Sequence, residues 1–122
     1  MTERRSRRGR GRVRTGRDAE RRARLHYRLR GYRILAANAW AGGYELDLVV
    51  QRGHLIAFVE VKAKRGTGYG DPLEMVGAEK RRRIARAAEM WLATHPRVGY
   101  RDVAFDVVAV SQGRLARVRD GV

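Results

Sequence analysis

The sequence predicts an α/β protein in which a mixed β-sheet is flanked by helices. A segment with helical spacing of its apolar residues comes first, three strand-like segments follow in succession, and a second helical segment precedes a further strand. The predicted order is therefore α-β-β-β-α-β. A chain of 122 residues is long enough for one domain with a modest core.

The first helix is predicted over residues 18–29. Ala19, Ala23 and Tyr27 recur every four residues and form one apolar stripe. Gly31 follows, and glycine commonly ends a helix because it adopts the left-handed conformation. The helix can therefore cover the sheet with one face.

Residues 1–17 contain eight Arg, one Glu and a single aliphatic residue, Val13. Such a segment buries too little apolar surface to offset the entropy of ordering. We expect a disordered Arg-rich tail over residues 1–17 and a single domain over residues 18–122. The tail could bind phosphates or act as a solubilising extension, and the sequence favours neither.

Three strands are predicted over residues 32–37, 45–51 and 55–63. The third, LIAFVEVKA, is the strongest because β-branched and aromatic residues dominate it. The first strand is expected to end at Asn38, before a loop of small residues. The turn between the second and third strands is placed at Arg52-Gly53.

The second helix is predicted over residues 77–94, where apolar residues from Ile84 to Trp91 recur at helical spacing. A strand over residues 102–110 follows, and residues 115–118 could form an edge strand. Asp106 lies inside the apolar strand. We expect it to be buried in a hydrogen-bonding role.

The chain is strongly basic. Its 28 Lys and Arg exceed its 13 Asp and Glu, which gives a formal net charge of +15. Nucleic acid is therefore the expected partner. A membrane surface is disfavoured because neither predicted helix has a broad apolar face. The lack of cysteine excludes disulfides and thiol nucleophiles and, with no apolar span or signal, leads us to expect a cytoplasmic protein.

Four charged residues lie within the second and third strands. Glu60 and Lys62 share one face of the third strand, and Glu45 and Asp47 share one face of the second. A two-residue turn at Arg52-Gly53 would place Glu45 opposite Glu60 and Asp47 diagonal to it. All four side chains would then project from the same face of one hairpin.

Three carboxylates on one sheet face repel one another unless a cation compensates them. A hard divalent cation such as Mg²⁺ or Mn²⁺ would do so, and carboxylates with one Lys suit metal-assisted phosphodiester hydrolysis. The alternative is structural, since inward charges on a strand also block aggregation. Asp47, Glu60 and Lys62 together favour the functional interpretation. Lys62 is also one of only three Lys in a chain with 25 Arg.

The second helix carries Arg81, Arg82, Arg83 and Arg86, which suit a phosphate track or, equally, a solvated helix face. The residues predicted to contact nucleic acid are Lys64, Arg65, Lys80, Arg81 and Arg83.

At these residues the chain resembles a known family. The blocks ELDLVV (45–50), FVEVKAKRG (58–66), EKRRRIARAAEMWL (79–92) and FDVVAV (105–110) occur in order. They resemble the PD-(D/E)xK nuclease superfamily and, more narrowly, the YraN-like UPF0102 family of small bacterial proteins. That family is similar in fold to archaeal Holliday junction resolvases. The resemblance covers residues 18–110.

The resemblance implies a restriction-endonuclease-like core and a nuclease-like domain. It implies that Asp47 and Glu60 bind metal and that Lys62 is the catalytic lysine. Lys80 would lie near phosphates. The implied metal-binding carboxylates are Asp47, Glu60, Glu45 and Glu20.

The sequence therefore favours a Mg²⁺- or Mn²⁺-dependent endonuclease acting on DNA, with branched or junction DNA as one substrate that the resemblance implies. The alternative is a non-catalytic nucleic-acid-binding protein on the same scaffold. Both predict salt-sensitive binding. The sequence does not decide whether the substrate is DNA or RNA. It also does not decide whether the protein forms a homodimer, which an enzyme cutting both strands of a four-way junction would need.

Overall fold

The computed structural model describes residues 2–63 and 76–121, with side chains over residues 16–63 and 76–120. It confirms the predicted α/β class and the order α-β-β-β-α-β, followed by a fifth strand. The elements are α1 (Thr2–Leu29), β1 (Arg33–Ala41), β2 (Tyr44–Arg52), β3 (Leu55–Ala63), α2 (Ala78–Ala93), β4 (Asp102–Ser111) and β5 (Arg114–Gly121).

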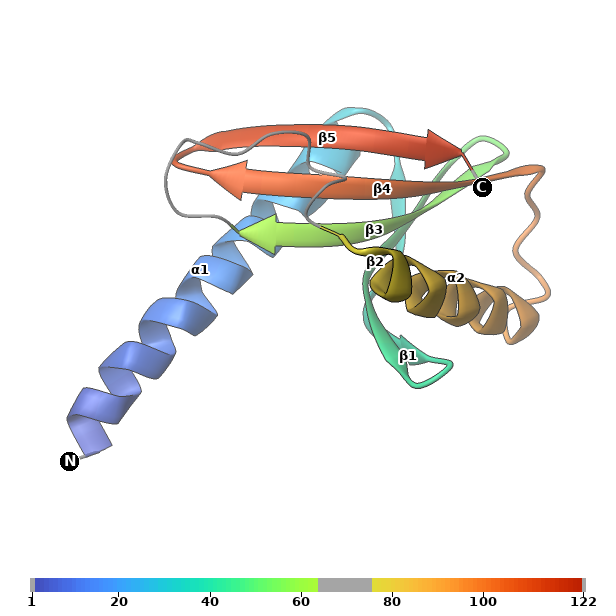
Figure 1. Cartoon of the computed structure of the whole chain (residues 1–122). Coiled ribbons are helices and arrows are strands. Elements are labelled where there is room, and N and C mark those ends of the chain that lie inside the picture. The colour runs from blue at the N-terminus through green and yellow to red at the C-terminus, as the bar shows by residue number, and fades with distance from the viewer. Residues whose placement is uncertain (1, 64–75, 122) are drawn as a thin grey trace.

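The strands form one mixed sheet in the order β1-β2-β3-β4-β5. Neighbouring strands are antiparallel except β3 and β4, which are parallel and are joined across one face by α2. Figure 1 shows that α1 and α2 cover opposite faces of this sheet. No helix in the described part of the chain is long and apolar enough to cross a membrane.

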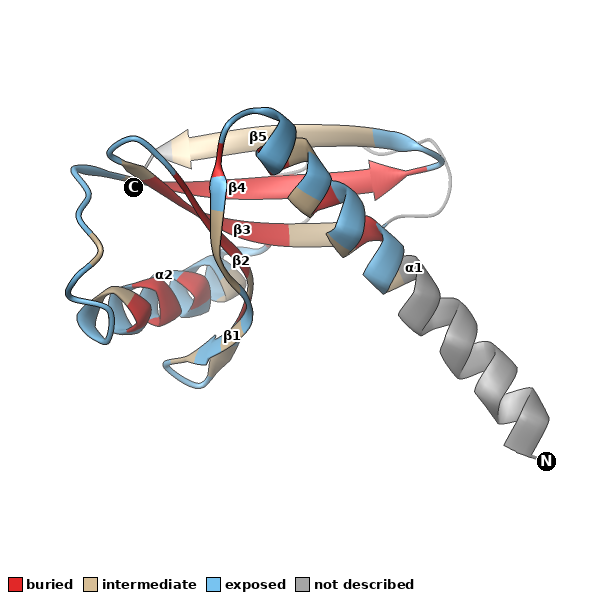
Figure 2. Cartoon of the chain, turned by 180° about the vertical axis from the view of Figure 1, so that it is seen from behind, coloured by how far each residue is buried: buried red, intermediate tan, exposed pale blue. Residues whose placement is uncertain are grey.

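Each helix closes its own apolar core. Under α1, the predicted stripe of Ala19, Ala23 and Tyr27 packs against one face of the central strands. Under α2, the buried residues Ile84, Ala87, Ala88 and Trp91 pack against the other face, where Phe58 lies. The central strands are buried on both faces, so their apolar residues run almost continuously (Figure 2).

Helix α1 begins earlier than predicted. It starts at Thr2 rather than near Asp18. The prediction of an Arg-rich tail over residues 1–17 is not tested by these bounds. Arg is a good helix former, and backbone propensity acts even where no apolar stripe is present. Burial in the described part of α1 begins at Ala19. The domain boundary at residue 18 stays a prediction.

Strand β1 is longer than predicted and its hairpin turn is tighter. Asn38 adopts a positive φ of 51° without ending the strand, which continues to Ala41. The turn consists of Gly42 and Gly43, both with positive φ. A Cβ atom on Gly42 would lie 3.3 Å from the Ala87 Cα atom, so glycine lets this hairpin pack closely against α2.

The turn between β2 and β3 lies one residue further along than predicted. Arg52 pairs with Leu55, so the turn residues are Gly53 and His54. Gly53, with a φ of 60°, takes the first position of this two-residue turn, and the Arg52 guanidinium lies over the Tyr32 ring, 4.5 Å from the ring centre. The pairing shifts by two residues in consequence, so Glu45 does not lie opposite Glu60 as predicted.

Candidate functional site

The candidate site lies where the ladder between β2 and β3 ends. The last ladder pair at this end is Leu48 with Val59. Beyond it, the Val61 N–H donates a 2.8 Å hydrogen bond to Asp47 Oδ2. The Asp47 side chain is therefore fixed between the two strands, and its carboxylate takes up a backbone donor of β3.

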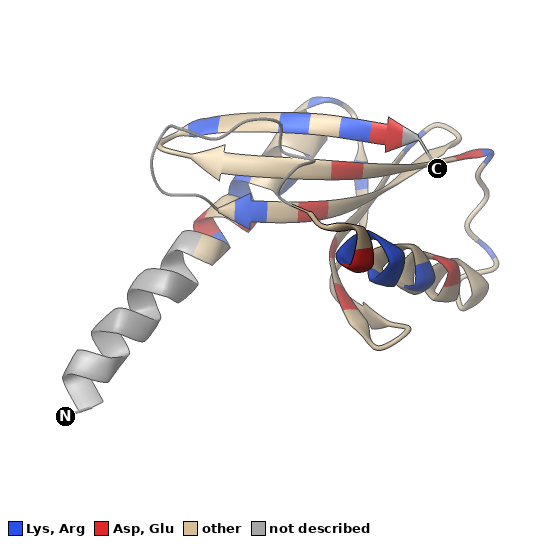
Figure 3. Cartoon of the chain, viewed as in Figure 1, with Lys and Arg blue, Asp and Glu red and all other residues tan. Residues whose placement is uncertain are grey.

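Glu60 is the buried acid of this site, with 5% of its surface exposed. Its Oε2 atom lies 2.8 Å from Lys80 Nζ and 3.2 Å from Lys62 Nζ. The Tyr44 hydroxyl donates to the same oxygen at 3.5 Å. Strands β2 and β3 and the first turn of α2 thus converge on one carboxylate. Figure 3 shows basic residues along α2 and near the end of β3.

The Asp47 carboxylate binds a proton more tightly than an ordinary aspartate does. Burial and the negative charge of Glu60 raise the pKa of Asp47 to about 7, with a smaller contribution from Glu20, while the Val61 N–H opposes them. The carboxyl is therefore partly protonated at neutral pH. A cation placed beside Asp47 would stabilise its ionised form and release this proton.

The two lysines on Glu60 differ in their proton affinity. Burial lowers the pKa of Lys62, and the neighbouring Lys80 lowers it further, against the effect of Glu60. Burial also lowers the pKa of Lys80, but its hydrogen bonds to Glu60 and Lys62 and the charge of Glu60 together outweigh burial, so the net pKa is raised. Lys62 is therefore the lysine that gives up a proton more readily.

The structure brings Asp47, Glu60 and Lys62 together and separates Glu45 from them. Glu45 is exposed, and its side chain makes no hydrogen bond or ion pair with another described residue. Leu46 packs on the α2 side of the sheet whereas Leu48 packs on the α1 side. Strict alternation, on which the shared face of Glu45 and Asp47 depended, therefore fails across this short stretch.

Glu20 lies on the α1 side of Asp47. Its Oε2 accepts a 3.3 Å hydrogen bond from Asn38 Nδ2, and its charge contributes to the raised pKa of Asp47. Over residues 16–63 and 76–120, no three His, Cys, Asp or Glu are grouped closely enough to hold a metal ion between them. The closely associated carboxylates are the pair Asp47 and Glu60.

The predicted phosphate contacts have other partners in this structure. Lys80 pairs with Glu60, and Arg81 forms an ion pair with Asp120 of β5. Arg83 pairs at 3.1 Å with Glu79, which is one turn away on the same helix. Lys64 and Arg65 lie outside the described residues.

Two contacts of the site were not predicted: Lys80 pairs with Glu60, and the Tyr44 hydroxyl donates to the same carboxylate. Tyr44 is three residues from Asp47, so ideal alternation places it on the other face; only the break between Leu46 and Leu48 brings it to the site. No signal in the sequence marks that break.

Comparison with known proteins gives the family. Residues 19–110 match the family described as "Uncharacterised protein family UPF0102". The chain belongs to the UPF0102 family. It is 46% identical over 91 residues to the UPF0102 protein of Symbiobacterium thermophilum, covering 73% of this chain and 75% of the relative. The Methylocella silvestris protein is 46% identical over 99 residues (81% and 78% covered), and the Halorhodospira halophila protein 40% over 105 (86% and 84%).

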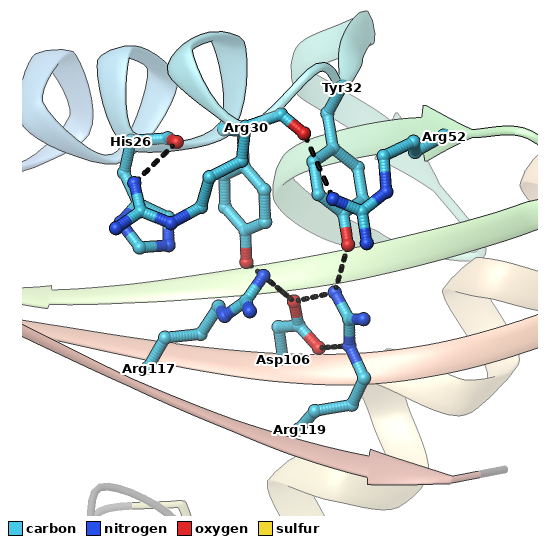
Figure 4. Close-up of polar contacts among 8 residues, drawn as sticks. His26, Arg30, Tyr32, Arg52, Asp106, Arg117 and Arg119 are labelled. Carbon is cyan, nitrogen blue, oxygen red and sulfur yellow. Dashed lines mark hydrogen bonds and ion pairs between the residues drawn. The ribbon is translucent and has the colours of Figure 1, made fainter.

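Residues 19–110, which match the UPF0102 family, include the whole candidate site and all of β4 except its last residue. One buried hydrogen-bond network includes a residue beyond this range. Asp106 of β4 is fully buried, as expected, and accepts hydrogen bonds from the Tyr27 hydroxyl at 2.6 Å and from Arg119 Nε at 2.8 Å and Nη2 at 2.9 Å. Arg119 also donates to the Tyr32 hydroxyl at 2.9 Å. Figure 4 shows this network, which joins β5 to α1.

Proposed function

We propose that this UPF0102 protein is a metal-dependent endonuclease that hydrolyses phosphodiester bonds in DNA. The observation that carries the proposal is the meeting of Asp47, Glu60 and Lys62 at the end of the β2–β3 ladder. This is the arrangement of two carboxylates and one lysine expected from the resemblance to PD-(D/E)xK nucleases. The net charge of +15 supports a nucleic-acid substrate.

The proposed cofactor is Mg²⁺ or Mn²⁺. Magnesium is usually bound by only one or two carboxylates together with water and substrate phosphates, so the pair Asp47 and Glu60 fits it. The raised pKa of Asp47 supports this fit, because burial and the nearby charge of Glu60 disfavour the ionised form of Asp47, which a bound cation would stabilise. A bound divalent cation would lower the pKa of a water molecule and polarise the scissile phosphate.

The side chains of the chain itself have distinct roles in the proposal. Asp47 and Glu60 bind the cation, and the Val61 N–H orients Asp47. Lys62 stabilises negative charge that develops on the phosphate, and its lowered pKa makes Nζ a better proton donor to a leaving oxygen. Lys80 holds Glu60 in place from α2.

The test is cleavage of supercoiled plasmid and branched DNA in Mg²⁺ or Mn²⁺. Glu60→Gln and Lys62→Met should each reduce the rate about a hundredfold or more. The matched control is Glu79→Gln, because Glu79 is exposed and paired only with Arg83 in the described structure. Wild-type activity that persists in both site variants would contradict the assignment of these residues.

A non-catalytic nucleic-acid-binding protein is the second candidate. It is favoured by the two ammonium groups on Glu60, which already neutralise this carboxylate, and by the lack of a three-residue metal group among the described residues. This alternative predicts salt-sensitive DNA binding by the wild type without cleavage in either metal. It also predicts that Glu60→Gln leaves DNA affinity unchanged or higher.

A further inference from the structure

An apolar groove of about 990 Å³ lies between α2 and the neighbouring part of the sheet. Phe58 and Phe105 form part of its lining and are paired in register across β3 and β4. Ile84, Ala88 and Leu92 line it from α2. Helix α2 packs mainly on β1 and β2, and the groove lies beside it over β3 and β4. Phe58 and Phe105 are themselves nearly buried, and the partly exposed apolar residues of the lining are Leu55, Leu92 and Val103.

The groove adjoins the candidate site. Phe58 is two residues from Glu60 on the same strand, so both side chains project from the same face of β3. On the helix, Arg81 of the groove directly follows Lys80, which pairs with Glu60. A ligand with one part beside Glu60 therefore has the groove within reach of its next part.

Basic residues lie around this apolar surface. The Arg81 guanidinium lies over the Phe105 ring, 5.7 Å from its centre, and Arg82 and Arg101 also line the groove. The acidic residues of the lining are Glu89 and Asp102. An apolar floor with an excess of arginine at its edge suits a ligand that joins a flat ring to an anion.

We propose that this groove binds an unpaired nucleobase of a nucleic-acid strand whose phosphate lies at the Glu60 site. The inference rests on the proposed function and assigns its substrate class: nucleic acid with a single-stranded segment. A volume of about 990 Å³ is in the range of ligand pockets and admits a base with its sugar. Bases inside a duplex are stacked on both faces and cannot enter.

A second hollow continues the same surface across α2. Arg82 lines both hollows, and in the second, of about 370 Å³, it is joined by Arg83 and Arg86. The glycine turn of the β1–β2 hairpin forms the opposite wall. Arginines at this spacing suit the phosphates that flank the bound base.

The test fills the groove from an exposed helix position. Ala85 is exposed and lines the groove, and Ala93 is exposed on the same helix outside that lining. Ala85→Phe should weaken binding of a fluorescent single-stranded oligonucleotide about tenfold, with little change for a blunt duplex of equal charge. The matched variant Ala93→Phe should bind both like the wild type. Equal single-strand affinity of the two variants would overturn the proposal.

A second probe needs no variant. An oligonucleotide of the same length with abasic positions throughout keeps its phosphates and loses its bases, so the wild type should bind it about tenfold more weakly. Equal affinity for the two oligonucleotides would also overturn the proposal. Both assays are run by fluorescence anisotropy in EDTA, where no metal-dependent cleavage occurs. These binding assays therefore test the base-binding role of the groove independently of whether the protein cleaves DNA.

Discussion

Lys80 Nζ lies 2.8 Å from Glu60 Oε2, closer than the 3.2 Å of Lys62. The buried carboxylate of β3 is thus neutralised chiefly from the first turn of α2, and the lysine predicted to be catalytic is the weaker of its two partners. Because both cations share one carboxylate, a change at either of them alters the proton affinity of the other.

Replacing Lys80 should therefore raise the pKa of Lys62. Lys80→Met removes a positive charge that lowers the pKa of Lys62, and Lys62 then remains as the lysine paired with Glu60. With only three lysines in the chain, their side-chain signals can be followed individually by NMR titration. Arg83→Met, which removes a charge from the same helix at the Glu79 pair, is the control. An unchanged Lys62 titration in Lys80→Met would show that the two lysines are not coupled.

Asp47 should make stability fall with rising pH. Its pKa is raised from 3.8 to about 7 in the folded protein, so between these values the folded state holds a proton that the unfolded chain has lost. The free energy of unfolding therefore decreases as pH rises from about 4 to about 7, by about 1.4 kcal/mol for each unit of pKa shift. Above pH 7 the full penalty is present.

Asp47→Asn should remove this penalty. Urea unfolding of the wild type and the variant between pH 4.5 and pH 8 should show the variant gaining relative stability as pH rises. Glu79→Gln is the control, since that carboxylate is exposed. A difference between wild type and Asp47→Asn that is constant across this range would show that Asp47 titrates normally.

The elements were predictable because their signals are local. The apolar stripes of both helices and the buried run of β3 appear directly in the residue pattern. The position of the β2–β3 turn also has a local signal, because Gly53 with its φ of 60° suits the first position of a two-residue turn. The contacts of Arg52 with Tyr32 and with the Arg30 carbonyl, at 2.9 Å, were not predictable locally, because both partners precede β1.

The candidate site was likewise predictable from the sequence only in part. Asp47, Glu60 and Lys62 stand out in the sequence because charge is rare in apolar strands. The shift of the turn changed the pairing of β2 with β3 by two residues. Because only an odd shift moves a side chain to the other face of the sheet, Glu60 and Asp47 still lie on the same face. The contacts of Lys80 and Tyr44 with Glu60 depend on where α2 and a local break in β2 lie, and neither is set by nearby residues.

Asp106 should be among the most costly polar residues to replace. It is fully buried against Arg119 and the Tyr27 hydroxyl, so Asp106→Asn leaves a guanidinium without its counter-charge. We expect a loss of about 3–5 kcal/mol in the free energy of unfolding, measured in urea. Tyr27→Phe removes one hydrogen bond and should cost about 1 kcal/mol. The exposed pair of Arg81 with Asp120 is the control, and Asp120→Asn should change stability by at most about 1 kcal/mol.

The β1–β2 turn offers a direct test of its contact with α2. Gly42 and Gly43 both have positive φ, so replacing either with Ala introduces backbone strain of about 1 kcal/mol. Only at Gly42 would the new methyl group meet a neighbour, 3.3 Å from the Ala87 Cα atom; at Gly43 nothing lies within 4 Å. Gly42→Ala should therefore be the more destabilising by about 1–3 kcal/mol in urea unfolding. Equal losses for the two variants would show that strain alone, and not close packing on α2, sets the requirement for glycine.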